Sequence, residues 1–209
     1  SKKNLKNADL QNLDLQEADL SEGILIEACL ENCNLSEADL CEADISGANL
    51  ENARLHRTIL YRCRGKEINF SNAILTQANL VEANLSGANF THANLMESNI
   101  EGANLINTCF KDANLCEVNL TGIFLVNANL SGADLTNAEC IAADFTGCDL
   151  SEANLSNTYI NHADLSGANL KSALNLTRDQ VETAFINKET LLPDSIPIIW
   201  VSKTEYEFE

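Results

Sequence analysis

Hydrophobic residues recur at every fifth position through most of the chain. From Leu5 to Leu170, each multiple of five carries Leu, Ile, Phe or Cys, with Gly65 as the exception. A small residue, usually Ala, stands two positions earlier, and Asn or Asp usually stands between the two, as in Ala88-Asn89-Phe90. The chain is therefore built from a five-residue repeat that runs from Lys3 to about Ala173.

This spacing fits neither a regular helix nor a regular strand. Residues five apart on an α-helix differ by about 140° around the axis, so they cannot share one face. In a strand, an odd spacing sends alternate residues to opposite sides. The chain must therefore turn within each repeat. We expect Ala88 and Phe90 to point inward from a short extended segment, and Thr91-His92 to turn the next corner.

Three observations predict that four repeats, or 20 residues, close one coil. Phe70, Phe90 and Phe110 lie 20 residues apart, where their rings would stack. The Ser-Gly repeats at 44–50, 84–90 and 164–170 are offset by 40 and 80 residues. Opposite charges also recur at this spacing: Arg62 with Glu42 and Glu82, Arg57 with Glu37, and Arg64 with Asp44. Residues 3–173 then form about 8.5 coils, a rod roughly 40 Å long.

The motif Ala-(Asn/Asp)-Leu-x-x resembles that of the pentapeptide-repeat family, whose members fold as right-handed quadrilateral β-helices with four repeats per turn. The resemblance implies an all-β solenoid, a right-handed quadrilateral parallel β-helix of about 8.5 coils over residues 1–174. It implies little about function, because the motif residues build the rod itself. The family is especially abundant in cyanobacteria, where most members have no known activity.

One coil is expected to be irregular. Gly65 removes a core side chain, and the resulting cavity would be filled only in part by Ile68, which stands where Ala is usual. We therefore expect a distorted coil or a bulge at this point.

The two ends of the chain differ in their predicted caps. Residues 175–209 leave the repeat and predict a C-terminal cap: a helix at about 178–187, with Thr177 and Gln180 as its capping box, then an extended tail. The N-terminal end carries no predicted cap. We expect it to adjoin either another domain or a second copy of the chain, which would give a homodimer through a coil end. Ser1 in place of Met is typical of a processed chain or of a domain from a larger protein, including a membrane-attached one.

The net charge of −18 changes the range of expected partners. Its sign disfavours direct binding to nucleic acid. Up to Ala173 the chain has 24 acidic and 10 basic residues, a net −14. Over roughly 40 Å this is one charge per ~3 Å, about half the density of B-DNA. Some members of the family resemble DNA in shape and charge and bind DNA gyrase, conferring quinolone resistance. That reading competes with a simpler one, in which the acidic surface keeps the rod soluble.

The candidate chemistry does not favour an enzyme or a cofactor site. His56, His92 and His162 are predicted to face outward, and His92 would form a surface charge pair with Asp112 one coil away. No nucleophile, phosphate-binding loop or cavity accompanies them. The carboxylates are dispersed over all sides of the predicted rod.

Eight cysteines are present, but no two of them lie 20 residues apart in one column, so no disulfide is expected. Their spacing does not match a metal site either. Free thiols favour a reducing cytoplasm. No run of 18 apolar residues predicts a membrane span in this segment.

Candidate partner-binding residues are those that break the repeat at outward positions. Exposed Arg and aromatic residues together are typical of interface hot spots. For the group that contains arginines, ion pairs with carboxylates of neighbouring coils would instead neutralise the charges within the rod itself. The sequence thus favours a structural or regulatory protein–protein interaction module with a protein partner. The two groups are Arg57, Ile59, Tyr61, Arg62 and Arg64, and Ile106, Phe124 and Val126.

Overall fold

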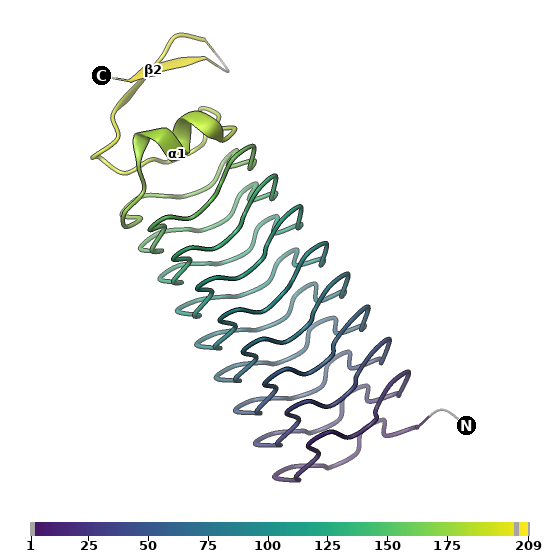
Figure 1. The fold of residues 1–209 in the computed structure, drawn as a ribbon. Helices are drawn as coiled ribbons and strands as arrows, with labels where there is room; N and C mark the ends of the chain where they lie inside the picture. Colours follow the sequence, from purple (N-terminus) through teal and green to yellow (C-terminus); the bar gives the residue numbers. More distant parts are fainter. Residues whose placement is uncertain (1–2, 203–204, 209) are drawn as a thin grey trace.

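The computed structural model describes residues 3–202 and 205–208 as a long rod of stacked coils (Figure 1). The chain starts at one end of the rod and finishes at the other. The helix α1 (Arg178–Thr183) covers the C-terminal end, beside an antiparallel hairpin of β1 (Ile198–Trp200) and β2 (Tyr206–Phe208).

Successive coils pair through parallel bridges between residues 20 apart, from Asn4–Ile24 to Asn154–Leu174. The prediction of four repeats per coil is therefore confirmed, and the rod has four faces. We number the faces in chain order. Their outward residues in the middle of the rod are Asp44, Arg64, Asn84, Asn104 and Phe124 on face 1, Asn49, Asn69 and Asn89 on face 2, Asn34, Arg54 and Ile74 on face 3, and Asp39, Ile59 and Asn79 on face 4.

Each corner is a tight turn that closes on the next repeat. At the corner after Leu85, the amide of Ala88 donates to the Leu85 carbonyl at 3.0 Å. The second turn residue, Gly87, has a φ of +71°, as a type II turn requires. Gly adopts this conformation without steric cost, which explains the Ser-Gly repeats. At the next corner His92 takes a φ of +57°, so surrounding interactions must hold a non-Gly residue there.

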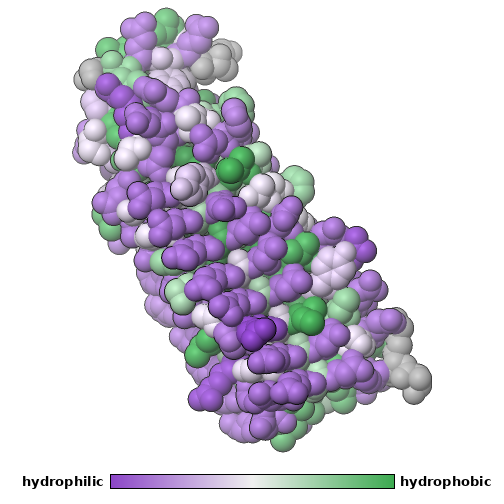
Figure 2. All heavy atoms as spheres, viewed as in Figure 1, coloured by the Kyte–Doolittle hydropathy of each residue, from purple (hydrophilic) through white to green (hydrophobic). Residues whose placement is uncertain are grey.

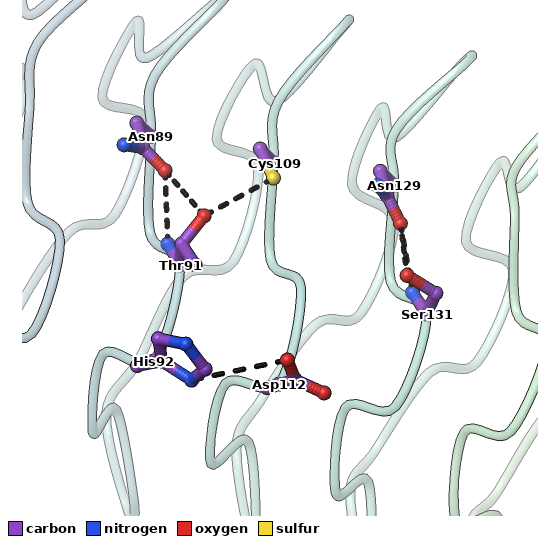
Figure 3. Close-up of polar contacts among 7 residues, drawn as sticks. All are labelled: Asn89, Thr91, His92, Cys109, Asp112, Asn129 and Ser131. Atoms are coloured by element: carbon purple, nitrogen blue, oxygen red, sulfur yellow. Dashed lines mark hydrogen bonds and ion pairs between the residues drawn. The ribbon is translucent and has the colours of Figure 1, made fainter.

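The Asn or Asp before each core residue organises the following turn. The Oδ1 atom of Asn89 accepts hydrogen bonds from the Thr91 amide (3.0 Å) and the Thr91 hydroxyl (2.6 Å), as Figure 3 shows. Asn129 and Ser131 repeat this arrangement two coils further along. This side-chain turn mimics a backbone turn. The polar residues of the repeat are thus explained by local structure.

Asp134 uses the same turn and should make stability depend on acid. Partial burial raises the pKa of its carboxyl, but hydrogen bonds from Thr136, Cys116 and Asn154 outweigh this effect and bring the pKa below its ordinary value of 3.8. A lowered folded-state pKa stabilises the protein above pH 3.8, and this contribution is lost as the pH falls through the folded-state pKa. We expect the melting temperature of Asp134→Asn to fall less than that of wild type as the pH is lowered from about 4 to about 2.

Melting curves at stepped pH values test this expectation. The Thr136→Val variant removes the hydroxyl donor but keeps the Asp134 carboxylate. Its melting temperature should therefore also fall less than that of wild type at acid pH. An equal fall in melting temperature for all three proteins would contradict the contribution of Asp134 to stability.

The inward side chains form one continuous core. Ala88 and Phe90 are buried, as expected. The rings of Phe70, Phe90 and Phe110 stack with centroid distances of 5.0 and 4.7 Å, which confirms the predicted aromatic column. Each coil therefore packs on its neighbours through like side chains at equivalent positions.

The prediction of a distorted coil or a bulge at Gly65 is wrong. The Gly65 amide keeps its regular hydrogen bond to the Asn84 carbonyl at 2.8 Å, and Arg64 bridges both Asp44 and Asn84. The cavity is filled from neighbouring coils: a Cβ at Gly65 would lie 2.8 Å from Leu85 Cδ2 and 3.4 Å from Ile45 Cγ1. Flexible side chains above and below thus compensate for the missing one, and the backbone does not bulge.

The C-terminal segment completes a further, modified coil. Phe185 bridges Asp164, and Leu191 bridges Asn169. Helix α1 begins with the predicted capping box of Thr177 and Gln180. The division of the chain into a rod (1–174) and a cap (175–209) stays a prediction, because coil-to-coil pairing continues beyond residue 174.

The predicted end of the helix at about residue 187 is wrong. The helix ends at Thr183, and its C-cap Ala184 is already extended. Val181 is buried, but Phe185 leaves the helix and is 59% exposed. The reason is that Phe185 extends the ladder of face 1, where pairing to Asp164 replaces further helical hydrogen bonds. The extended tail is the β1–β2 hairpin, in which Trp200 pairs with Tyr206.

At the opposite end, the first coil is only partly covered. Leu5, Leu10 and Leu15 are half-buried, whereas the equivalent Leu residues from Leu25 onward are fully buried. Within the described ranges, no helix combines the length and apolar character needed to cross a bilayer.

Candidate protein-binding surface

The first group of candidate residues, Arg57, Ile59, Tyr61, Arg62 and Arg64, lies in a single coil. We call it the arginine cluster. Arg57 occupies the corner between faces 3 and 4, and Ile59 lies on face 4 with 39% of its surface exposed. Tyr61 and Arg62 form the next corner, and Arg64 lies on face 1. The cluster therefore wraps around face 4 from one corner to the next.

Two of its three arginines are paired at the predicted spacing of 20 residues. Arg62 Nε lies 2.6 Å from Glu82 Oε2, and this carboxylate raises the pKa of Arg62. Arg64 Nε lies 3.2 Å from Asp44 Oδ2. Arg62 also packs over the ring of Tyr61, with 4.9 Å between Cζ and the ring centroid. The side chains of both arginines remain about half exposed, so each pair contributes little to stability.

The predicted pair between Arg57 and Glu37 does not form. Both residues occupy the same column, but among residues 3–202 and 205–208 no ion pair joins them. A surface pair must fix two long side chains in one geometry for a small gain in free energy. Arg57 therefore presents its guanidinium to solvent.

The second group, Ile106, Phe124 and Val126, also forms a contiguous patch, which we call the phenylalanine cluster. Phe124 bridges Asn104 on face 1 and is 53% exposed. Ile106 and Val126 stack at the corner between faces 1 and 2, and the Asn107 amide donates to the Val126 carbonyl at 3.0 Å.

The structure brings both clusters to the borders of face 1. Arg64 and Phe124 lie on this face three coil steps apart, about 14 Å at ~4.8 Å per step. Between them lie the outward residues Asn84 and Asn104. A hydrogen bond beside Phe124 is stretched to 3.4 Å, against 2.9 Å for its counterpart at Asn104. The clusters can therefore contribute to one surface.

Other exposed apolar residues were missed by sequence reasoning. Ile74 is 42% exposed, Met96 is 37% exposed and Tyr159 is 55% exposed. All three replace polar residues at outward positions, so the signal used for Phe124 would also have found them. Figure 2 shows one side of the rod, where hydrophobic residues form isolated green patches on a mainly hydrophilic surface.

His92 and Asp112 lie together on the exposed surface of the rod. His92 Nδ1 is 3.9 Å from Asp112 Oδ2, and both side chains are exposed (Figure 3). A shallow groove of about 500 Å³ lies between α1 and the last coil, lined mainly by Asn and Thr residues. In the part of the chain that the structure describes, no group of His, Cys, Asp or Glu could hold a metal ion.

All eight cysteines lie within the described ranges and have free thiols. Four of them are buried in the core: Cys33, Cys63, Cys140 and Cys148. Burial raises the pKa of Cys63 and of Cys148 to about 12. These two thiols stay protonated at neutral pH and are poor nucleophiles.

Comparison with known proteins identifies the family. The family model "Pentapeptide repeats" matches this chain in eight copies, over residues 4–36, 33–64, 66–102, 97–122, 113–151 and 148–178. The chain belongs to the pentapeptide-repeat family, and its fold is the right-handed quadrilateral β-helix of that family.

Solved structures agree with this assignment. HetL, a pentapeptide repeat protein involved in heterocyst differentiation regulation from the cyanobacterium Nostoc sp. strain PCC 7120, is 33% identical. The alignment covers 92% of this chain and 86% of HetL, with a TM-score of 0.65. A trypsin-treated form of QnrB1, a plasmid-mediated fluoroquinolone resistance protein, is 17% identical over 90% of this chain and 92% of its own, with a TM-score of 0.56. That second likeness shows the fold alone. The comparison with curated proteins gave no match.

Proposed function

We propose that this protein is a non-enzymatic, regulatory protein-binding rod. The observation that carries the proposal is the surface around face 1, where exposed Arg and Phe side chains and the half-buried Tyr61 replace the polar residues of the repeat. Aromatic and Arg residues supply most of the binding energy in protein interfaces. The similarity to HetL, which is involved in the regulation of heterocyst differentiation, supports a regulatory role.

In this proposal the partner contacts both clusters at once. Tyr61 and Arg62 form one border of the surface, and Phe124 with Val126 forms the other. Between the two clusters, Asn84 and Asn104 offer amide groups for hydrogen bonds. The partner is a protein whose identity is open, and no direct contact with nucleic acid is required.

Cross-linked pull-down from the source cell tests this function. Wild-type rod should capture a partner that the Tyr61→Ala/Arg62→Glu variant loses, because the variant removes the aromatic anchor and reverses a charge. A partner list unchanged by the double substitution would count against the arginine cluster as the contact.

The net charge of −18 supports a second candidate function, a DNA-mimicking inhibitor or protector of DNA gyrase. The rod carries only about half the charge density of B-DNA, and the arginine cluster interrupts its acidic surface. We therefore rank this function second. A DNA-supercoiling assay with added protein separates the two functions. The protein-binding proposal expects gyrase activity to be unchanged at a high concentration of the rod. Inhibition of gyrase, or protection of gyrase from a quinolone, would favour DNA mimicry.

Two further parts of the proposal concern assembly and location. The first coil leaves Leu13 45% exposed, which supports a homodimer through this coil end. Eight free thiols fit a reducing compartment, and we propose that the rod works in the cytoplasm.

A further inference from the structure

Two arginines lie close together in sequence where face 3 meets face 4. Arg54 lies on face 3, and Arg57 lies at the corner between faces 3 and 4. Both are exposed, and within the described ranges neither takes part in an ion pair. The chain has 31 acidic residues and only 13 basic ones, so acidic partners are plentiful elsewhere on the rod. This corner therefore carries two exposed guanidinium groups that form no ion pair within the described ranges.

Exposed aliphatic side chains surround these two arginines. Ile74 bridges Arg54 directly and is 42% exposed, and Ile59 lies two residues after Arg57. Met96, 37% exposed, lies one coil beyond Ile74, and its carbonyl accepts from the Gln77 amide at 3.0 Å. We call Arg54, Arg57, Ile59, Ile74 and Met96 the corner surface.

The charges around the corner surface lie at its ends. Glu37 and Asp39 occupy the preceding coil, below Arg57 and Ile59. Glu97 lies two coils above Arg57, where its carboxylate accepts a hydrogen bond from Gln77 Nε2 at 2.7 Å. His56 fills the corner itself and contacts the Thr76 hydroxyl at 2.8 Å. The centre of the surface is thus apolar and positively charged, with carboxylates confined to its edges.

The backbone of this region restricts which element can bind. The Leu55 amide donates to the Ile74 carbonyl at 2.7 Å, and the Arg57 amide donates to the Thr76 carbonyl at 2.9 Å. Because these groups are already paired between coils, the flank of the rod cannot accept an added β-strand. An α-helix satisfies its own backbone and can dock through side chains alone. Its turns repeat at about 5.4 Å, close to the ~4.8 Å spacing of the coils.

We propose that the corner surface binds an amphipathic helix of the partner protein, a helix with Leu, Ile, Phe or Met along one stripe and Asp or Glu beside it. The apolar stripe packs on Ile59, Ile74 and Met96, and the carboxylates pair with Arg54 and Arg57. This inference rests on the proposed protein-binding function and names the chemistry of the partner. The helix-binding residues centre on the corner between faces 3 and 4, whereas Tyr61 and Phe124 lie beside face 1.

Selection from a displayed helix library tests the inference. The library presents helical peptides of about 18 residues, randomised along one face, to the full chain. Helices that combine acidic with aliphatic or aromatic residues should be enriched. Their affinity should fall at least about tenfold for Arg54→Glu/Arg57→Glu, because like charges then face each other. The control Lys6→Glu/Lys111→Glu changes the net charge by the same amount away from the corner and should alter affinity less than about twofold.

Three results would overturn the inference: no enriched helix, enrichment of basic helices, or an equal loss of affinity in both double variants. Circular dichroism melts confirm that the variants fold, since all four positions are exposed. The proposed function is tested separately by the pull-down. A cellular partner that requires Tyr61 but binds the Arg54→Glu/Arg57→Glu rod normally would refute the acidic helix and leave the protein-binding function intact.

Discussion

Replacing Phe90 by Ala is expected to lower the free energy of unfolding by about 3–5 kcal/mol. Phe90 is fully buried and stacks between Phe70 and Phe110, so the substitution leaves a cavity lined by two rings. Stability in a stacked array depends on contacts between neighbouring coils. The loss therefore weakens two interfaces at once, in the middle of the rod.

Urea denaturation of wild type and variant measures this change. Phe124→Ala is the matched control, because Phe124 is 53% exposed on the same rod and its removal should alter the free energy of unfolding by less than about 0.5 kcal/mol. A loss below about 1 kcal/mol for Phe90→Ala, or equal losses for both variants, would contradict the inward stack.

The second large effect is expected at the C-terminal cap, where Gln180→Ala should open the last coil. The Gln180 side chain joins three parts of the structure. Its Oε1 accepts from the Thr177 amide at 2.9 Å, and its Nε2 donates to the carbonyls of Leu155 (3.0 Å) and Thr158 (2.8 Å). Removing it leaves these groups without their partner, at a cost of about 1–3 kcal/mol.

Native-state hydrogen exchange locates the consequence. The amides of His162 and Leu165 are bonded to the cap segment and should exchange faster in the variant. The amide of Leu30, near the other end, should be unchanged, because coils far from the cap keep their neighbours. Gln77→Ala removes one exposed hydrogen bond to Glu97 and serves as the control. Uniform exchange along the rod in Gln180→Ala would show that the residue does not hold the cap.

The period of the rod could be predicted from the sequence because each repeat meets the same environment. Once 20 residues close a coil, every residue lies above its equivalent, so the stacking of Phe70 on Phe90 follows directly. The ion pairs of Arg62 with Glu82 and of Arg64 with Asp44 follow in the same way. The capping box of Thr177 and Gln180 is a local signal and was also predictable.

Other features depend on details that the period does not contain. At Gly65, the rotamers of Leu85 and Ile45 decide whether the cavity is filled or the backbone bulges. The end of α1 depends on a competition between further helical hydrogen bonds and coil-to-coil pairing. Phe185 pairs with Asp164, which would not be possible in a longer helix. Whether Arg57 pairs with Glu37 depends on surface side-chain freedom, which sequence spacing cannot fix.

The candidate surface was only partly predictable for a related reason. Tyr61 and Phe124 break the repeat visibly, and the 20-residue period places both beside face 1. Ile74 and Met96 break it too, and their significance appears only when Arg54 and Arg57 are seen beside them without ion pairs. The inward residues explain the fold, and we therefore look for function at the outward positions.

The central claim is that the surface beside face 1, and not the core, carries the function. The most direct test measures the affinity of the captured partner for Tyr61→Ser/Phe124→Asn, which restores residues typical of the repeat. We predict a melting temperature within a few degrees of wild type and a loss of affinity of at least about tenfold. Unchanged affinity in a stably folded variant would contradict the claim.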